Sequence, residues 1–172
     1  MSPTQREKLS KFLTMSYDII VIGAGQAGIT AAQRTQAAGL KTLIVENDLV
    51  CGECHYWACV SSKALLRSGH ALRAAQHVSG LAEATSRGIV VKEVLEQRNK
   101  TVDRWIDDEY SHKQKVNSGF DILHRHAEIT EVKTLKIVSS DGKSQNVTAK
   151  YAVVIATGSL CRGSENQRNR RC

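Results

Sequence analysis

The sequence has 172 residues, a formal net charge of +7 and 41% hydrophobic residues. This length suits one domain with a substantial core, and no apolar run approaches the ~20 residues that a membrane helix needs. Residues 161–172 carry four Arg against one Glu, and residues 1–16 carry three basic residues against one Glu. Because five of the seven net charges lie in these polar ends, solvated tails explain the charge better than a nucleic-acid partner does.

The first 16 residues contain no apolar signal-peptide core, which predicts a cytoplasmic protein without a membrane partner, with a mitochondrial location as the alternative. We expect residues 1–16 to form a polar N-terminal extension. Residues 17–160 should form the folded domain, and residues 161–172, which have no apolar period, should be a disordered basic tail.

A βαβ unit is predicted directly after the extension. The apolar, β-branched run at 17–22 is typical of a strand that is buried on both faces. Ile29 to Ala38 favours a helix that Gly39 ends. A second apolar strand runs from Lys41 to Val45 and leads into Glu46. Strand, turn, helix and strand thus follow one another within about 30 residues, the size of one βαβ unit.

Gly23, Gly25 and Gly28 form a Gly-x-Gly-x-x-Gly pattern between the first strand and its helix. The first glycine permits a tight turn, the second lets the backbone approach a pyrophosphate, and the third allows close helix–strand packing. The helix N-terminus then directs N–H groups at the phosphates, and Glu46 is spaced to accept ribose hydroxyls. The pattern predicts a dinucleotide site. A tight βα turn without a ligand is the alternative.

Three of the five cysteines cluster after this unit, at positions 51, 54 and 59. On a regular helix, Cys54 and Cys59 would lie about 140° apart with a rise of about 7.5 Å, whereas a disulfide needs Cα atoms within roughly 7 Å. We therefore expect Cys54 on an irregular turn that leads into a helix. Cys59 should lie near the start of that helix, where a thiolate is favoured.

Zinc is an alternative use of this cluster, with Cys51, Cys54, His55 and Cys59 as its ligands. Structural zinc ligands usually come as two separated pairs, whereas these four crowd into nine residues. We therefore predict redox chemistry and no metal.

The remainder of the chain predicts two helices, several short strands with an Asp141-Gly142 hairpin turn, and a last buried strand. The helices are expected at 62–77 and 92–115, and the strands at 120–128, 132–138, 146–150 and 151–155. Together the elements predict an α/β fold, with a Rossmann-type parallel sheet and a small antiparallel β-meander inserted before the last strand.

The combination Cys54-x4-Cys59 followed by Ser62-Lys63-Ala64, behind a glycine-rich βαβ unit, resembles the pyridine nucleotide–disulfide oxidoreductases. That family includes dihydrolipoamide dehydrogenase, glutathione reductase and mercuric reductase. The resemblance covers about residues 17 to 160.

The resemblance implies FAD as the cofactor. Gly23, Gly25 and Gly28 would hold its pyrophosphate, and Glu46 its adenosine ribose. The backbone around Ala127 would meet the adenine region. The residues that would close over the cofactor follow the last strand: Ala156, Thr157 and Gly158.

The resemblance also implies a redox route. Cys54 would be the interchange thiol that meets the substrate, Cys59 would lie against the flavin, and Lys63 would lie near flavin N5. In the family, NAD(P)H reduces FAD, FAD reduces the Cys54–Cys59 disulfide, and the dithiol reduces a small-molecule or disulfide substrate. Family members are homodimers.

The sequence departs from the family pattern in three places. Cys51 stands where the family has Gly, which creates a competing Cys51-x-x-Cys54 dithiol, and Ser61 stands where the family usually has Pro. Family members are also more than twice as long and continue into NAD(P)-binding and dimerisation domains. We therefore expect a fragment that carries the FAD-binding portion. The alternative is a non-catalytic remnant that binds an adenine dinucleotide weakly or not at all.

Overall fold

The computed structural model describes residues 16–108, 119–138, 142 and 144–159. The expected N-terminal extension (apart from Ser16) and the basic tail lie outside these residues. The chain divides into two compact units. We call residues 53–106 the helical unit, and the other described residues the sheet unit.

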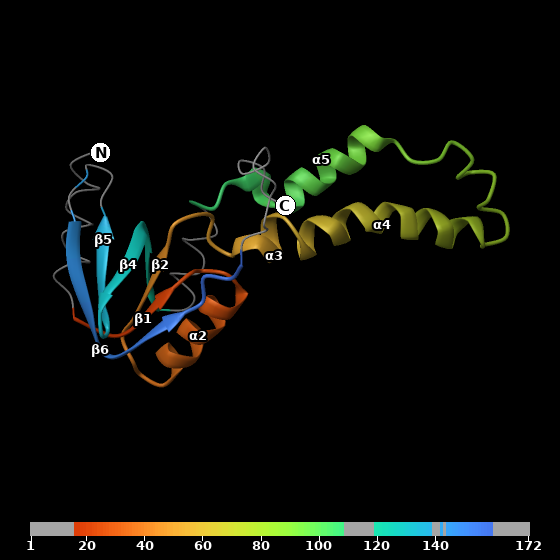
Figure 1. Cartoon of the computed structure of the whole chain (residues 1–172). Coiled ribbons are helices and arrows are strands. Elements are labelled where there is room, and N and C mark those ends of the chain that lie inside the picture. Colours follow the sequence, from red (N-terminus) through yellow and green to blue (C-terminus); the bar gives the residue numbers. More distant parts are fainter. Residues whose placement is uncertain (1–15, 109–118, 139–141, 143, 160–172) are drawn as a thin grey trace. The chain divides into compact units, whose positions relative to one another are not determined.

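The sheet unit contains a six-stranded sheet in the order β3-β2-β1-β6-β5-β4 (Figure 1). β1, β2, β3 and the second half of β6 pair in parallel, whereas β4, β5 and the first half of β6 pair antiparallel. The predicted α/β class, with a parallel sheet and an antiparallel meander, is therefore confirmed. The strands are β1 (Tyr17–Ile22), β2 (Thr42–Glu46), β3 (Asp121–His124), β4 (His126–Glu131), β5 (Thr134–Val138) and β6 (Ser144–Ile155).

β6 joins the parallel and antiparallel parts of the sheet. Two strands were predicted here, at 146–150 and 151–155, but the structure has one 12-residue strand. Its Val147 pairs with Leu135 of β5, and its Val153 pairs with Ile20 of β1. A register shift opposite Tyr17 absorbs the change of partner. No turn residue separates the two halves, so the chain stays extended across the change. Asp141 of the predicted hairpin turn lies outside the described residues.

The core of the sheet unit lies on both faces of β1, which explains the unbroken apolar run at 17–22. Ile20 joins a cluster with Leu43 of β2 and Leu135 of β5. The adjacent Val21 points to the opposite face, where it lies close to Gly28 of α2 (Gln26–Ala37). Alternate residues of one strand therefore pack on the meander and on the helix.

The helical unit contains two helices that lie side by side, α4 (Cys59–Gln76) and α5 (Val91–Thr101) (Figure 1). The short helix α3 (Gly52–Tyr56) leads into this unit. α5 buries no residue and α4 buries only Ser61. No helix in the described part of the chain is long and apolar enough to cross a membrane.

The predicted helix at 92–115 is interrupted after Thr101, because residues 102–107 are not α-helical, and its residues 109–115 lie outside the described part. A short 3-10 turn, η1 (Asp103–Trp105), follows with positive φ angles at all three residues. Fully buried Val102 precedes this turn, and the turn brings Trp105 to Trp57. Tertiary contacts, which local periodicity does not encode, therefore end the helix early.

Candidate functional site

The Gly-x-Gly-x-x-Gly segment, which we call the glycine turn (residues 23–28), needs glycine at its first and third positions. Gly23 has φ +101°, and a Cβ there would lie 2.3 Å from the Ala156 carbonyl oxygen. A Cβ on Gly28 would lie 1.9 Å from the Gly23 oxygen. The Gly23 amide also donates to the Val45 carbonyl at 2.8 Å. These contacts hold the turn between the ends of β1, β2 and β6.

Gly25 is different, because it has an ordinary φ of −71° and precedes the first turn of α2. A Cβ there would meet no described atom within 4 Å. No side chain caps α2, and the first N–H groups of an α-helix have no partner within the helix. Open space in front of free helical N–H groups fits a phosphate group, so the glycine turn fits the FAD pyrophosphate.

The Glu46 carboxylate reaches back to the glycine turn. Its Oε2 accepts a hydrogen bond from the Ala24 amide at 2.6 Å, and its Oε1 accepts one from the Asp48 amide at 2.7 Å. A carboxylate oxygen has two lone pairs, so each oxygen keeps capacity for a ribose hydroxyl. The structure thus brings Glu46 to the glycine turn, while its predicted role as the ribose ligand stays a prediction.

The other predicted cofactor residues fall into two groups. Ala156 and Thr157 lie against Gly23, and the Ala156 amide donates to the Ile22 carbonyl at 2.8 Å. Gly158 follows with φ +71°. Ala127, by contrast, lies in β4 and packs against the core cluster of the sheet. Its predicted contact with adenine stays a prediction.

The segment at Cys51 and Gly52 forms the second wall of the glycine turn, and the family resemblance indicated position 51 but not Gly52. The Cys51 amide donates to the Ala24 carbonyl at 2.8 Å, and Cys51 is buried with φ +84°. A Cβ on Gly52 would lie 3.0 Å from the Gly25 Cα. The available signal was the glycine next to Cys51, since both positions adopt a backbone conformation that favours glycine.

The buried carboxylate of Asp107 supports this segment. Oδ2 of Asp107 accepts a hydrogen bond from the Val50 amide at 2.7 Å and lies 3.4 Å from His124 Nε2. His124 in turn pairs with Glu46 in the β2–β3 register. Hydrogen bonds to the Glu46 and Asp107 carboxylates therefore hold the loop after β2 at both of its ends.

The predicted thiol pair lies at a break between two helices. Cys54 is in the middle of α3, and Cys59 is the first residue of α4. The amides of Trp57 and Ala58 both donate to the Glu53 carbonyl at 2.8 Å, which interrupts the regular helical pattern. The prediction for Cys59 is confirmed, whereas Cys54 lies in a short helix and the irregular turn comes after it. We call residues 54–59 the dithiol loop.

The two thiols interact in the structure, where both are free cysteines. A side-chain hydrogen bond with Cys59, together with partial burial and the charge of Cys59, raises the pKa of Cys54. The backbone of Cys59 and the charge of Lys63 act in the opposite direction. The pair and Lys63 therefore form one electrostatic group. Whether the thiols oxidise to a disulfide stays a prediction.

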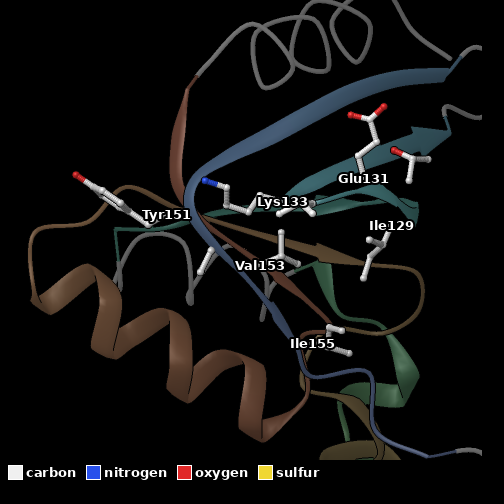
Figure 2. Close-up of a pocket in the computed structure, with 9 residues that line it drawn as sticks. Ile129, Glu131, Lys133, Tyr151, Val153 and Ile155 are labelled. Carbon is white, nitrogen blue, oxygen red and sulfur yellow. The ribbon is translucent and has the colours of Figure 1, made fainter.

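Within the described residues, no group of three or more His, Cys, Asp and Glu side chains is placed to hold a metal ion. An open hollow on the sheet unit is a further concave region, and none of the predicted site residues lines it. Figure 2 shows Val153 and Ile155 along β6, and Ile129, Glu131 and Lys133 from β4 and the turn after it. Its lining is largely apolar, with Thr130, Glu131, Lys133 and Tyr151 as the polar side chains.

Comparisons with known proteins match most of the chain. A family model described as "Pyridine nucleotide-disulphide oxidoreductase" matches residues 17–167. The dihydrolipoyl dehydrogenase of Bacillus subtilis is 28% identical over 153 residues, which cover 86% of this chain and 32% of that protein. A mercuric reductase of Staphylococcus aureus is 32% identical over 143 residues, which cover 83% of this chain and 25% of that protein.

A solved structure shows the same fold. It is the Cu(II) complex of the HOCl-induced flavoprotein disulfide reductase RclA from Escherichia coli, which matches with a TM-score of 0.65 at 19% sequence identity. The match covers 88% of this chain and 31% of that one. The chain thus spans between a quarter and a third of the length of these relatives.

Proposed function

Since the chain belongs to the pyridine nucleotide-disulphide oxidoreductase family, we propose that it binds FAD at the glycine turn and exchanges electrons through Cys54 and Cys59. The observation that carries the cofactor part is the open space at Gly25 in front of the N-terminus of α2. Gly23 and Gly28 would hold the turn, and Glu46 would accept the adenosine ribose.

The dithiol loop supplies the second part of the proposal. When bound, FAD would supply two-electron transfer between NAD(P)H and the cysteine pair. Cys54 would attack a small-molecule or disulfide substrate as a thiolate, because the thiolate is the nucleophilic form of cysteine. Cys59 would then displace the reduced product and close the intramolecular disulfide. Lys63 would favour the anionic form of the pair, in line with its effect on the pKa of Cys54.

The chain matches only part of its relatives, and this limits the activities that we propose for it. Because the chain spans 32% of the Bacillus relative, oxidation of NAD(P)H, choice of substrate and homodimer formation are proposals for the complete enzyme. For these 172 residues we propose FAD binding and thiol–disulfide exchange. We expect them in the cytoplasm or a mitochondrion, where free thiols such as those of Cys54 and Cys59 persist.

FAD binding can be tested with a substitution that leaves the fold intact. Gly25→Ala adds a methyl group that meets no described atom, but this group would stand where the pyrophosphate approaches. We expect at least a tenfold loss of FAD affinity, or about 1.4 kcal/mol, with an unchanged melting temperature. Gly69→Ala in α4 is the matched control and should bind FAD like the parent chain. Failure of the parent chain to bind excess FAD would overturn the cofactor proposal.

A second candidate function is dinucleotide binding without catalysis. One observation favours it: the buried Cys51 side chain lies on the segment that walls the glycine turn, where the family pattern has glycine. Reduction of the bound flavin, followed by titration of thiols, separates the two functions. Electrons that pass from flavin to the Cys54–Cys59 disulfide favour the oxidoreductase, while a reduced flavin beside an unchanged disulfide favours the binding function.

A further inference from the structure

The turn η1, which we call the clamp turn, has an unusual backbone. Asp103, Arg104 and Trp105 have φ angles of 50°, 52° and 59°, and none is glycine. Left-handed conformations cost about 1–2 kcal/mol per residue for most L-amino acids. Three in succession persist only where surrounding contacts hold them, and such strain is a reason to look for a function.

The first contact of the clamp turn reaches the residue after Cys54. Oδ2 of Asp103 lies 3.2 Å from His55 Nε2, and the two residues are 48 positions apart in the sequence. The His55 side chain is only 13% exposed and its ring packs edge-on against fully buried Tyr56. The contact therefore ties α3, the helix that carries Cys54, to the clamp turn.

The second contact reaches the opposite side of the dithiol loop. The rings of Trp105 and Trp57 lie 5.6 Å apart, between centroids, and Arg98 of α5 stacks over Trp105 at 5.2 Å. The indole nitrogen of Trp105 is buried and has no hydrogen-bond partner in the described part of the chain. Stacking therefore accounts for the placement of this ring. Arg104 completes the turn by pairing with Glu96 of α5.

We propose that the clamp turn positions the dithiol loop and thereby sets the reduction potential of the Cys54–Cys59 pair. Its Asp103 contacts residue 55 and its Trp105 contacts residue 57, and both positions lie between the two cysteines. This inference rests on the proposed function, because it assumes that the pair cycles between dithiol and disulfide. Asp103 and Trp105 act here as positioning residues.

The contacts at residues 55 and 57 preorganise the dithiol loop for disulfide formation. A disulfide tolerates only a narrow range of Cα and Cβ separations, and the Cys59 side chain already acts on Cys54 in the reduced protein by raising its pKa. A loop held at residues 55 and 57 loses less conformational freedom when the sulfur–sulfur bond forms. The clamp turn should therefore stabilise the disulfide relative to the dithiol, and its loss should make the disulfide easier to reduce.

The reaction to be measured is exchange with glutathione. Cys54 and Cys59 lose two protons and two electrons and form one disulfide, while one oxidised glutathione molecule takes up both and becomes two reduced molecules. The full chain is equilibrated in glutathione buffers of different ratios, quenched with acid and alkylated. Mass spectrometry of the peptide that contains both cysteines then gives the equilibrium constant.

Two substitutions break the first contact from opposite ends. His55→Ala keeps the short helix α3, and Asp103→Gly keeps the left-handed backbone without strain. We expect each to lower the equilibrium constant for disulfide formation about tenfold, which corresponds to about 30 mV for this two-electron couple. The double variant should shift it no further than either single variant, because both remove the same contact. Glu83→Gln, an exposed charge of the same unit, should cause no shift.

Substitutions of Trp105 provide a second, independent test of the clamp turn. Trp105→Ala removes the stack on Trp57 and should again lower the constant, whereas Trp105→Phe retains a ring and should restore it. A parent chain that forms no Cys54–Cys59 disulfide in any buffer would overturn the proposed function. A parent chain that forms it with the same constant as the Asp103→Gly and Trp105→Ala variants would overturn the clamp and leave the proposed function standing.

Discussion

In the sheet unit the candidate functional atoms belong to the backbone, whereas in the helical unit they belong to side chains. The glycine turn is fixed by carbonyls and amides of β1, β2 and β6, and it lies beside a core of buried aliphatic residues. The dithiol loop leads from α3 into α4, whose only buried residue is Ser61, and its geometry depends on ring and ion-pair contacts of the clamp turn. The two regions should therefore respond differently to the same kind of substitution.

The largest difference in stability between the two units is expected when a leucine of each unit is replaced by alanine. Leu135 is fully buried in the sheet cluster, whereas Leu66 of α4 is 57% exposed. Leu135→Ala should destabilise the protein by about 2–5 kcal/mol through lost burial and a cavity, and Leu66→Ala should stay within about 0.5 kcal/mol. Urea unfolding followed by far-UV circular dichroism measures both. Equal effects at the two positions would contradict the contrast in packing.

Replacement of a helical glycine by alanine should lower the free energy of unfolding in the sheet unit and raise it in the helical unit. Gly28 and Gly69 both lie in helices, but a Cβ on Gly28 would meet a carbonyl at 1.9 Å, while one on Gly69 would meet only the end of Arg73 at 3.8 Å. Gly28→Ala should destabilise the sheet unit by about 2–3 kcal/mol. Gly69→Ala should stabilise α4 by up to about 1 kcal/mol, because alanine favours helices.

The two units can be monitored separately in this experiment. Both tryptophans of the chain, Trp57 and Trp105, lie in the helical unit. Tryptophan fluorescence therefore reports on Gly69→Ala, and hydrogen exchange of β1 and β6 amides reports on Gly28→Ala. A Gly28→Ala protein with undiminished amide protection would show that the turn can relax around the added methyl group.

The contrast also explains what the sequence could predict. The buried strand at 17–22 and the tight turn after it were predicted correctly because each depends on local backbone rules and a strict spacing. Cys59 at the start of α4 followed from helix geometry together with the distance that a disulfide requires. The single strand β6 was missed because its halves change partner without a turn residue between them, and strand pairing is not a local property.

Sequence patterns could not identify the residues that act through tertiary contacts. Asp103 and His55 are 48 positions apart, and nothing in their neighbourhoods marks them as partners. The same holds for Asp107, which binds the Val50 amide across the fold of the sheet unit. A tertiary contact also explains the early end of the second predicted helix, because Trp105 stacks on Trp57 of the dithiol loop.

A smaller difference in stability is expected between the alanine and glycine variants of Cys51 and of Cys59. Cys51 has φ +84°, so Cys51→Gly should be more stable than Cys51→Ala by about 1 kcal/mol. Cys59 begins α4, so Cys59→Ala should be more stable than Cys59→Gly by up to about 1 kcal/mol. Thermal unfolding of the four variants gives the two differences. The same ranking at both positions would mean that the backbone at 51 relaxes when its side chain changes.

The smallest effect concerns the acidity of Cys54 in the reduced protein. The hydrogen bond with Cys59 is the largest of the causes that raise the pKa of Cys54, and the charge of Lys63 lowers it. Cys59→Ala should therefore shift the pH profile of Cys54 alkylation to lower pH, because more thiolate exists at a given pH. Lys63→Gln should shift the profile to higher pH for the opposite reason.

The measurement uses iodoacetamide under reducing conditions, with the Cys54 peptide quantified by mass spectrometry over a pH range around the ordinary thiol pKa. Lys92→Gln removes a charge from α5 and is the matched control, since Lys92 is not among the causes of the Cys54 shift. Cys51 is buried and should remain unmodified in the folded protein. If Cys59→Ala leaves the Cys54 profile unmoved, the two thiols do not interact in solution. The chemistry of the helical unit would then depend on single side chains, with no coupled pair for the clamp turn to position.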